Sequence, residues 1–104
     1  MADFEAGREI ISLGTTNNTF YIIASGSVTA HVRGHEITIK KGDIVGIFDI
    51  TMPVHTCKYI AAENCSLIPY TFENTDSLLA LLDRNSDLRK LFVLSFCRNI
   101  VYLI

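Results

Sequence analysis

Apolar and polar residues alternate with a period of two over much of the first two thirds of the chain. Residues 28–32 alternate between aliphatic and polar side chains, and residues 36–40 repeat the pattern. Arg33-Gly34 lies between these segments, where a tight hairpin turn is expected because glycine tolerates a positive φ. The pattern predicts two half-buried antiparallel strands, with the two isoleucines of the second strand on its buried face.

Further apolar runs of strand length lie on both sides of this hairpin. They span residues 9–11, 20–24, 58–62 and 66–72, and turn-forming residues separate them. A loop centred on Pro53 interrupts the series, because proline is excluded from a central strand. This order of short strands predicts a mainly β fold, a small antiparallel β-roll with a jelly-roll-like path.

The period changes after residue 73, where helices are expected. Residues 74–76 offer capping side chains for a helix with four leucines between positions 78 and 82. Residues 85–87 offer caps for a second helix, expected over residues 88–104. The sequence therefore predicts two helices appended to the C-terminal end of the β-roll.

The second predicted helix is apolar on more than one side, so it needs two surfaces to bury against. One surface is expected to be the sheet of the same chain. The other is expected to be a neighbouring domain or a second copy of the chain, the latter contacted through Leu91, Leu94 and Ile100. The sequence therefore predicts a homodimer that is held together by its C-terminal helix.

Length, charge and hydropathy narrow the possible functions. With 104 residues the chain forms one domain. Its formal net charge of -2 gives no long-range attraction to nucleic acid or to an anionic membrane. The apolar run over residues 91–104 is shorter than the roughly 20 residues of a membrane span. We therefore expect no membrane partner, and DNA contact only through a domain outside this chain.

The cysteine content points to a reducing compartment. Cys57, Cys65 and Cys97 form an odd set without a C-x-x-C pair, as expected for small buried side chains rather than disulfides. The first ten residues lack the basic and then apolar layout of a signal peptide. A cytoplasmic location is expected.

The order of these parts resembles the cyclic nucleotide-binding domain family, which includes the sensory module of catabolite-activator-type (Crp/Fnr) regulators. The matching segments are Gly7 to Ile11, Phe20 to Val28, Gly42-Asp43, Gly46, and the helix-break-helix from Leu78 to Leu88. The resemblance covers residues 7–104 and implies a β-roll over about 7–72 with helices over about 75–104. It also implies a non-enzymatic sensory role.

In that family the segment after Gly-Asp is a phosphate-binding cassette. It reads Phe-Gly-Glu, with an Arg-Ala or Arg-Ser pair further along, and the resemblance implies that Gly46, Ile47 and Phe48 occupy its first part. Ile47 stands where the glutamate is expected, and Thr56 or Cys57 stands where the arginine is expected. Lys58 follows, but a shift of one residue reverses the face of a strand. The resemblance therefore implies a degenerate cassette that does not bind cyclic AMP or cyclic GMP in the usual way.

Histidines and cysteines offer alternative sites. His31 and His35 flank the hairpin turn and suggest a metal site, but without a third ligand they are better explained as solvated polar residues. His55 and Cys57 suggest a base and a nucleophile, but no orienting acid follows them. A cupin-type metal enzyme is the rival β-roll, and Pro53-Val54-His55 only faintly matches its second motif. We expect no catalytic residue, no metal and no cofactor.

The most favoured function is the N-terminal effector and dimerisation module of a Crp/Fnr-type transcription regulator. The chain starts almost at its first predicted strand and stops inside an apolar helix, so we expect it to be a segment of a longer protein. The alternative is a regulatory or scaffold domain of a protein that does not bind DNA, with no ligand. The sequence leaves open whether an unidentified small-molecule effector binds the domain.

Overall fold

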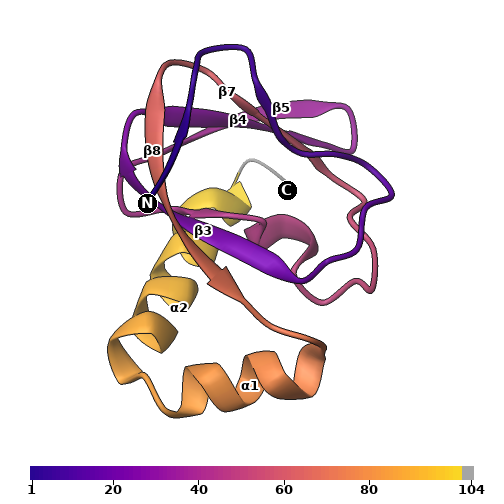
Figure 1. The fold of residues 1–104 in the computed structure, drawn as a ribbon, viewed down its shortest axis with the longest axis vertical. Coiled ribbons are helices and arrows are strands. Elements are labelled where there is room, and N and C mark those ends of the chain that lie inside the picture. Colours follow the sequence, from indigo (N-terminus) through magenta and orange to yellow (C-terminus); the bar gives the residue numbers. More distant parts are fainter. Residues whose placement is uncertain (102–104) are drawn as a thin grey trace.

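Eight strands form two four-stranded antiparallel sheets, which face one another, and two helices follow them (Figure 1). The computed structural model describes residues 1–101. The strand order is β1-β8-β3-β6 in one sheet and β2-β7-β4-β5 in the other. The strands are β1 (Ala2–Phe4), β2 (Glu9–Ile11), β3 (Thr19–Ser25), β4 (Ser27–Val32), β5 (His35–Lys40), β6 (Ile44–Val45), β7 (Lys58–Ala61) and β8 (Cys65–Thr71). The predicted antiparallel β-roll with C-terminal helices is confirmed, and neither sheet closes into a barrel.

The hairpin of β4 and β5 has the predicted register and faces. Val28 pairs with Ile39 and Ala30 with Ile37, and all four side chains are buried. The alternation in the sequence therefore places one face of this hairpin against the opposite sheet. The pattern does not predict β1, which pairs with the start of β8.

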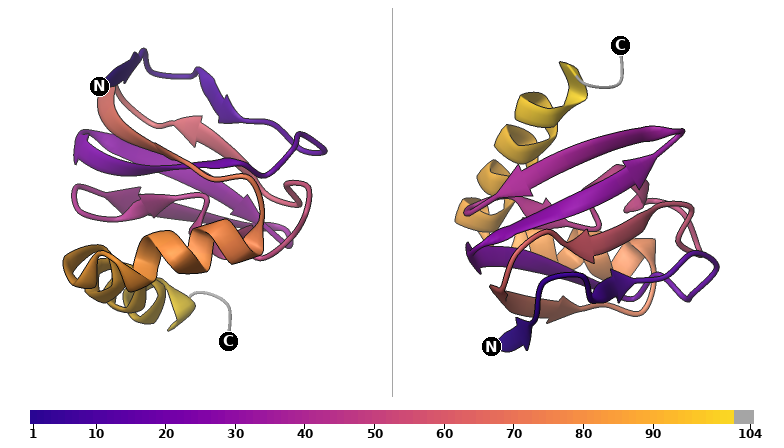
Figure 2. Two further views of the ribbon diagram at one scale, coloured as in Figure 1. Left: turned by 60° about the horizontal axis from the view of Figure 1, so that its bottom comes forward. Right: turned by 90° about the horizontal axis from the view of Figure 1, so that it is seen from above.

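The protein has two apolar cores, and each is formed by different secondary-structure elements. The first lies between the two sheets, whose arrangement Figure 2 shows, and is made of aliphatic residues, Tyr59 and two cysteines. The second joins β3, β6 and β8 to the helices, and Phe20 is at its centre. The ring of Phe20 stacks on Tyr70 at 5.1 Å and meets Phe92 edge-on at 4.9 Å. Aromatic packing of this kind fixes the position of the helices on the sheet.

Both helices begin at an asparagine cap, at the breaks that the sequence predicts. In α1 (Thr75–Asp83) the side chain of Asn74 accepts from the amide of Ser77 at 2.9 Å. In α2 (Ser86–Ile100) the side chain of Asn85 accepts from the amide of Leu88 at 3.1 Å. The second helix begins two residues earlier than predicted, and residues 102–104 of the predicted helix lie outside the described part. None of the helices in residues 1–101 has the length and apolar character needed to cross a membrane.

Polar contacts anchor α2 to the turn between β5 and β6. The carboxylate of Asp43 accepts hydrogen bonds from Arg98 at 2.6 Å and from the hydroxyl of Ser95 at 3.2 Å. The same hydroxyl accepts from the amide of Ile44 at 3.3 Å. Because Asp43 is nearly buried, these donors also keep its charge partnered. The start of the segment after Asp43, which contains the cassette positions Ile47 and Phe48, also lies against α2.

Candidate functional site

The segment between β6 and β7 carries the cassette positions. It contains the short 3-10 helix η1 (Ile47–Asp49), which follows Gly46. Gly46 has a φ of 105°, which side-chain-bearing residues rarely adopt. This backbone conformation turns the chain out of β6 and into η1. The glycine predicted as a cassette position is thus required by local geometry.

The carboxylate of Asp49 is the centre of this segment. One of its oxygens, Oδ2, accepts from His55 Nδ1 at 2.9 Å, from the amide of Thr56 at 2.9 Å and from the amide of Cys57 at 3.1 Å. The other oxygen, Oδ1, accepts from the hydroxyl of Tyr59 at 3.0 Å. Asp49 is only 2% exposed. Burial of a carboxylate is tolerated when hydrogen-bond donors of this kind replace its lost hydration.

The donors around Asp49 are themselves fixed in place. Because a carboxylate only accepts, the hydrogen of His55 lies on Nδ1. The hydroxyl of Tyr59 accepts from the amide of Phe48 at 3.2 Å. Burial, and after it the Asp49 carboxylate, raises the pKa of Tyr59, so the phenol stays protonated and can donate. The network therefore ties η1 to the start of β7.

The amide of Asn17 holds the other side of the loop. Its Nδ2 donates to the carbonyl oxygens of Asp49 at 2.8 Å and Met52 at 2.9 Å, with a longer contact of 3.3 Å to Ile50. Within residues 1–101, Oδ1 of Asn17 is buried without a hydrogen-bond partner. One buried side chain thus contacts the carbonyl oxygens of three residues within the four-residue segment 49–52.

The predicted cassette residues have different environments. Ile47 is buried in the second core, and Phe48 packs against both cores. Thr56 is exposed, so only its backbone amide contributes to the cluster. Lys58 opposes His31 in the β4–β7 register, whereas the neighbouring Tyr59 is buried. The Lys58 ammonium is therefore on the opposite face of the strand from the Asp49 cluster.

Two alternative sites find little support in the described residues. His31 lies opposite Glu36 and His35 lies opposite Val32, so the two imidazoles are on opposite faces of the hairpin. Within residues 1–101, no three histidine, cysteine or acidic side chains are grouped to hold a metal ion. Burial, and then Asp49, raises the pKa of the Cys57 thiol, which disfavours the thiolate that a nucleophile needs.

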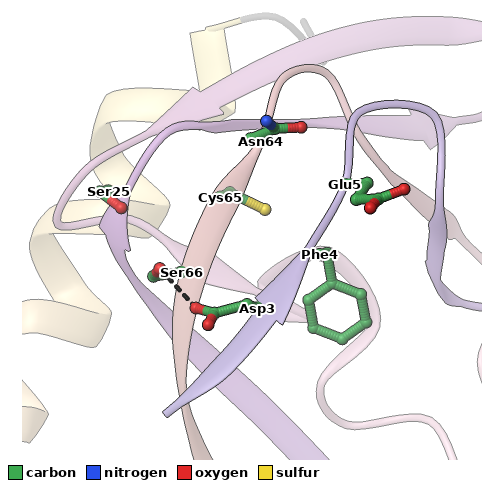
Figure 3. A pocket seen from close by; sticks show the side chains of 7 residues that line it. All are labelled: Asp3, Phe4, Glu5, Ser25, Asn64, Cys65 and Ser66. Atoms are coloured by element: carbon green, nitrogen blue, oxygen red, sulfur yellow. Dashed lines mark hydrogen bonds between the residues drawn. The ribbon is translucent and has the colours of Figure 1, made fainter.

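Two cavities are lined by residues other than Asp49, His55, Cys57 and Tyr59. One, of 470 Å³, lies beside β1 and the start of β8, where Asp3 accepts a hydrogen bond from Ser66 at 2.6 Å and the thiol of Cys65 lies nearby (Figure 3). The other is an apolar groove of 480 Å³ between η1 and α2. Its lining residues are Ile47, Phe48, Ile50, Thr51, Phe92, Val93, Phe96 and Cys97.

Comparison with known proteins gives a structural match. No protein-family model matches the chain, and none of the curated proteins matches it. A solved structure described as "Sp-2Cl-cAMPS bound to PKAR CBD2" is similar, with a TM-score of 0.63 and 22% sequence identity. The similarity covers 88% of this chain and 67% of that chain. The chain has the fold of a cyclic nucleotide-binding domain.

The residues that organise this site within the cyclic nucleotide-binding fold differ from those that the sequence suggests. Asp49, Tyr59 and Asn17 are absent from the predicted site. Thr56 and Cys57 are predicted cassette positions, and His55 is considered only as a base beside Cys57. One signal is present in the sequence. Asp49 is the only ionisable residue between positions 44 and 54 and is flanked by Phe48 and Ile50. An acid in such an apolar segment is buried only if it is partnered.

Proposed function

We propose that the chain is a non-enzymatic regulatory domain that does not bind cyclic AMP or cyclic GMP in the usual way. The observation that carries this proposal is the position of the Asp49 carboxylate. This carboxylate accepts hydrogen bonds from the backbone amides of Thr56 and Cys57. These amides lie in the segment where the family resemblance implies a phosphate site. A phosphate that approached these amides would meet a buried like charge.

The magnitudes support this proposal. A desolvated charged partner is worth about 2–5 kcal/mol in binding, and each 1.4 kcal/mol is a factor of ten in affinity. Ile47 and Thr56 supply no charge at the expected glutamate and arginine positions. Two like charges a few ångströms apart in a buried site add a further repulsion of several kcal/mol. Affinity for a cyclic nucleotide should therefore be lower by several orders of magnitude than with a complete cassette.

The finer role that we propose is the effector and dimerisation module of a Crp/Fnr-type transcription regulator. Any DNA contact would come from a domain outside this chain. The proposal is supported by α2, which leaves several apolar side chains exposed. These are Val93, Leu94, Phe96, Ile100 and Val101. Leu91 instead packs against the second core, so we place the proposed dimer contact on Leu94 and Ile100.

Isothermal titration calorimetry with cyclic AMP and cyclic GMP tests the proposed function. We expect no binding tighter than roughly 0.1 mM, which corresponds to about −5.5 kcal/mol. Adenosine is the control ligand, because it lacks the phosphate and shows whether the base binds alone. A micromolar dissociation constant for either cyclic nucleotide would contradict the proposal.

A further inference from the structure

Four hydrogen-bond donors converge on a single buried carboxylate in the segment between β6 and β7. Two are backbone amides, one is an imidazole nitrogen and one is a phenol, all between 2.9 and 3.1 Å from the oxygens of Asp49. Donors that converge in this way form an anion-binding site. Here the anion belongs to the chain itself.

The burial of these groups shows that they form a built site. Asp49, His55, Cys57 and Tyr59 are all buried. Each of the four donors is already bonded to an oxygen of Asp49, so none of them is available to another anion. Without the carboxylate, the buried Cys57 amide and Tyr59 hydroxyl would lose the acceptor of their hydrogens, which is strongly unfavourable.

We propose that residues 46–57, together with the hydroxyl of Tyr59, form an anion site whose occupant is the side chain of Asp49. The loop thereby holds its anion-bound conformation without an external effector. The site takes a small carboxylate by chemical class, and a variant that lacks the Asp49 side chain should accept formate in its place. This inference deepens the proposed function by naming the group that occupies the site.

The occupied site also fixes the surface on which α2 rests. Asp49 is the last residue of η1, and the hydroxyl of Tyr59 links its carboxylate to the amide of Phe48. Ile47, at the other end of η1, packs in the second core with Phe92 of α2. An internal anion therefore keeps η1 in one position, and α2 docks on that fixed surface.

The test is chemical rescue of Asp49→Ala by sodium formate, followed by thermal unfolding. Sodium chloride at equal ionic strength is the salt control. Asp49→Asn is the matched variant, because its side chain still fills the space and leaves no room for formate. At a formate concentration ten times its dissociation constant, the folding equilibrium of Asp49→Ala should rise about elevenfold. For a domain of this size that shift raises Tm by roughly 5–10 °C.

We expect rescue of Asp49→Ala by formate only, with little effect on wild type and Asp49→Asn. Equal responses of all three proteins to formate and chloride would overturn the proposal. If Asp49→Ala does not fold in chloride, recovery of its native circular dichroism in formate is the readout. If Asp49→Ala folds in neither salt, the Tm of Asp49→Asn becomes the readout. A Tm equal to that of the exposed-acid variant Asp83→Asn would contradict the proposal, and a Tm lower by 10 °C or more would support it.

The outcomes for this site and for the proposed function can be told apart. One outcome is that calorimetry shows cyclic AMP binding to wild type while formate still rescues Asp49→Ala. The internal anion would then stand, and the nucleotide would bind elsewhere on the fold. Conversely, the absence of both nucleotide binding and formate rescue would support the proposed function and contradict the proposal of an internal anion.

Discussion

At the scale of single residues, the charge of Asp49 and the protonation of its neighbours depend on one another. A carboxylate that is 2% exposed is stable only when donors surround it. The phenol of Tyr59 can donate only while it is protonated. Burial, and then the Asp49 carboxylate, raises the pKa of Tyr59 and so preserves the donor. The cluster should therefore weaken when the solution is made alkaline.

This dependence predicts how stability changes with pH. The folded-state pKa of Tyr59 is raised above that of the unfolded chain, which is about 10. The stabilisation from this group is therefore complete below pH 10 and is lost as pH rises toward the folded-state pKa. Urea unfolding should show a decline of up to about 1.4 kcal/mol per pH unit from Tyr59.

Tyr59→Phe is the variant that isolates this group. Cys57 and Cys65 also have raised pKa values and contribute to the decline in both proteins. The difference in slope between wild type and Tyr59→Phe above pH 10 therefore belongs to Tyr59. Near pH 7 the variant should be less stable by about 1–3 kcal/mol, because Asp49 loses one donor. Parallel slopes above pH 10 would show that Tyr59 is not a buried donor.

The sequence marks some of these residues but cannot assign their partners. Asp49 lies between two apolar side chains, which signals a buried or partnered acid. Its donors follow six to ten positions later, on a loop whose path depends on the pairing of β7 with β4. No local periodicity encodes that path. The absence of a glutamate at position 47 and of an arginine at positions 56 and 57 is therefore visible in the sequence, whereas the donors around the Asp49 carboxylate become visible only in the fold.

At the scale of secondary-structure elements, glycines set the corners of the β-roll. Gly26 joins β3 to β4 with a φ of 86°, and a Cβ atom there would lie 2.5 Å from the carbonyl oxygen of Asn64. Gly34 closes the β4–β5 hairpin with a φ of 80° and has open space around it. The first glycine is required by backbone conformation and by packing, and the second by conformation alone.

Substitution of these two glycines by alanine gives a matched pair of variants. Gly34→Ala should lower the free energy of unfolding by about 1–2 kcal/mol, the strain of a left-handed conformation. Gly26→Ala should suffer the same strain and, in addition, a steric overlap with the start of β8. Its free energy of unfolding should therefore be about 1–3 kcal/mol lower than that of Gly34→Ala. Denaturant unfolding of both variants measures the difference directly. Equal losses would mean that the close approach of β3–β4 to β8 is absent in solution.

The elements themselves follow from the sequence more closely than the site does. Strict alternation predicts β4 and β5, and the capping residues at 74–76 and 85–87 predict the two helix starts to within two residues. The short strand β1 gives no such signal, because it consists of three residues with mixed polarity. Its pairing depends on the exposed edge of β8, a tertiary feature.

At the scale of the whole molecule, α2 has two different faces. Phe92 packs into the second core, and Ser95 and Arg98 bind the Asp43 carboxylate. The buried face thus includes polar groups, while Leu94 on the outer face is 55% exposed. Exposed apolar side chains along one helix are typical of an interaction surface. This arrangement supports the proposed dimer through α2.

Leu94→Glu tests the dimer, and Leu79→Glu is its control. Leu79 lies on α1 and is 53% exposed, so the two substitutions place the same charge at equally exposed leucines. Sedimentation velocity at rising protein concentration should show dimers for wild type and Leu79→Glu, and monomers for Leu94→Glu. A wild-type protein that stays monomeric at high concentration would rule out this interface.

The central claim is that the amides of Thr56 and Cys57 are already bonded to Asp49 in the free protein. Hydrogen exchange of these amides, measured by NMR with and without millimolar cyclic AMP, tests it directly. Because Thr56 is exposed, protection of its amide reports on this hydrogen bond. We predict slow exchange at both positions and no change on adding cyclic AMP. Fast exchange in the free protein, with protection only after cyclic AMP is added, would contradict the account.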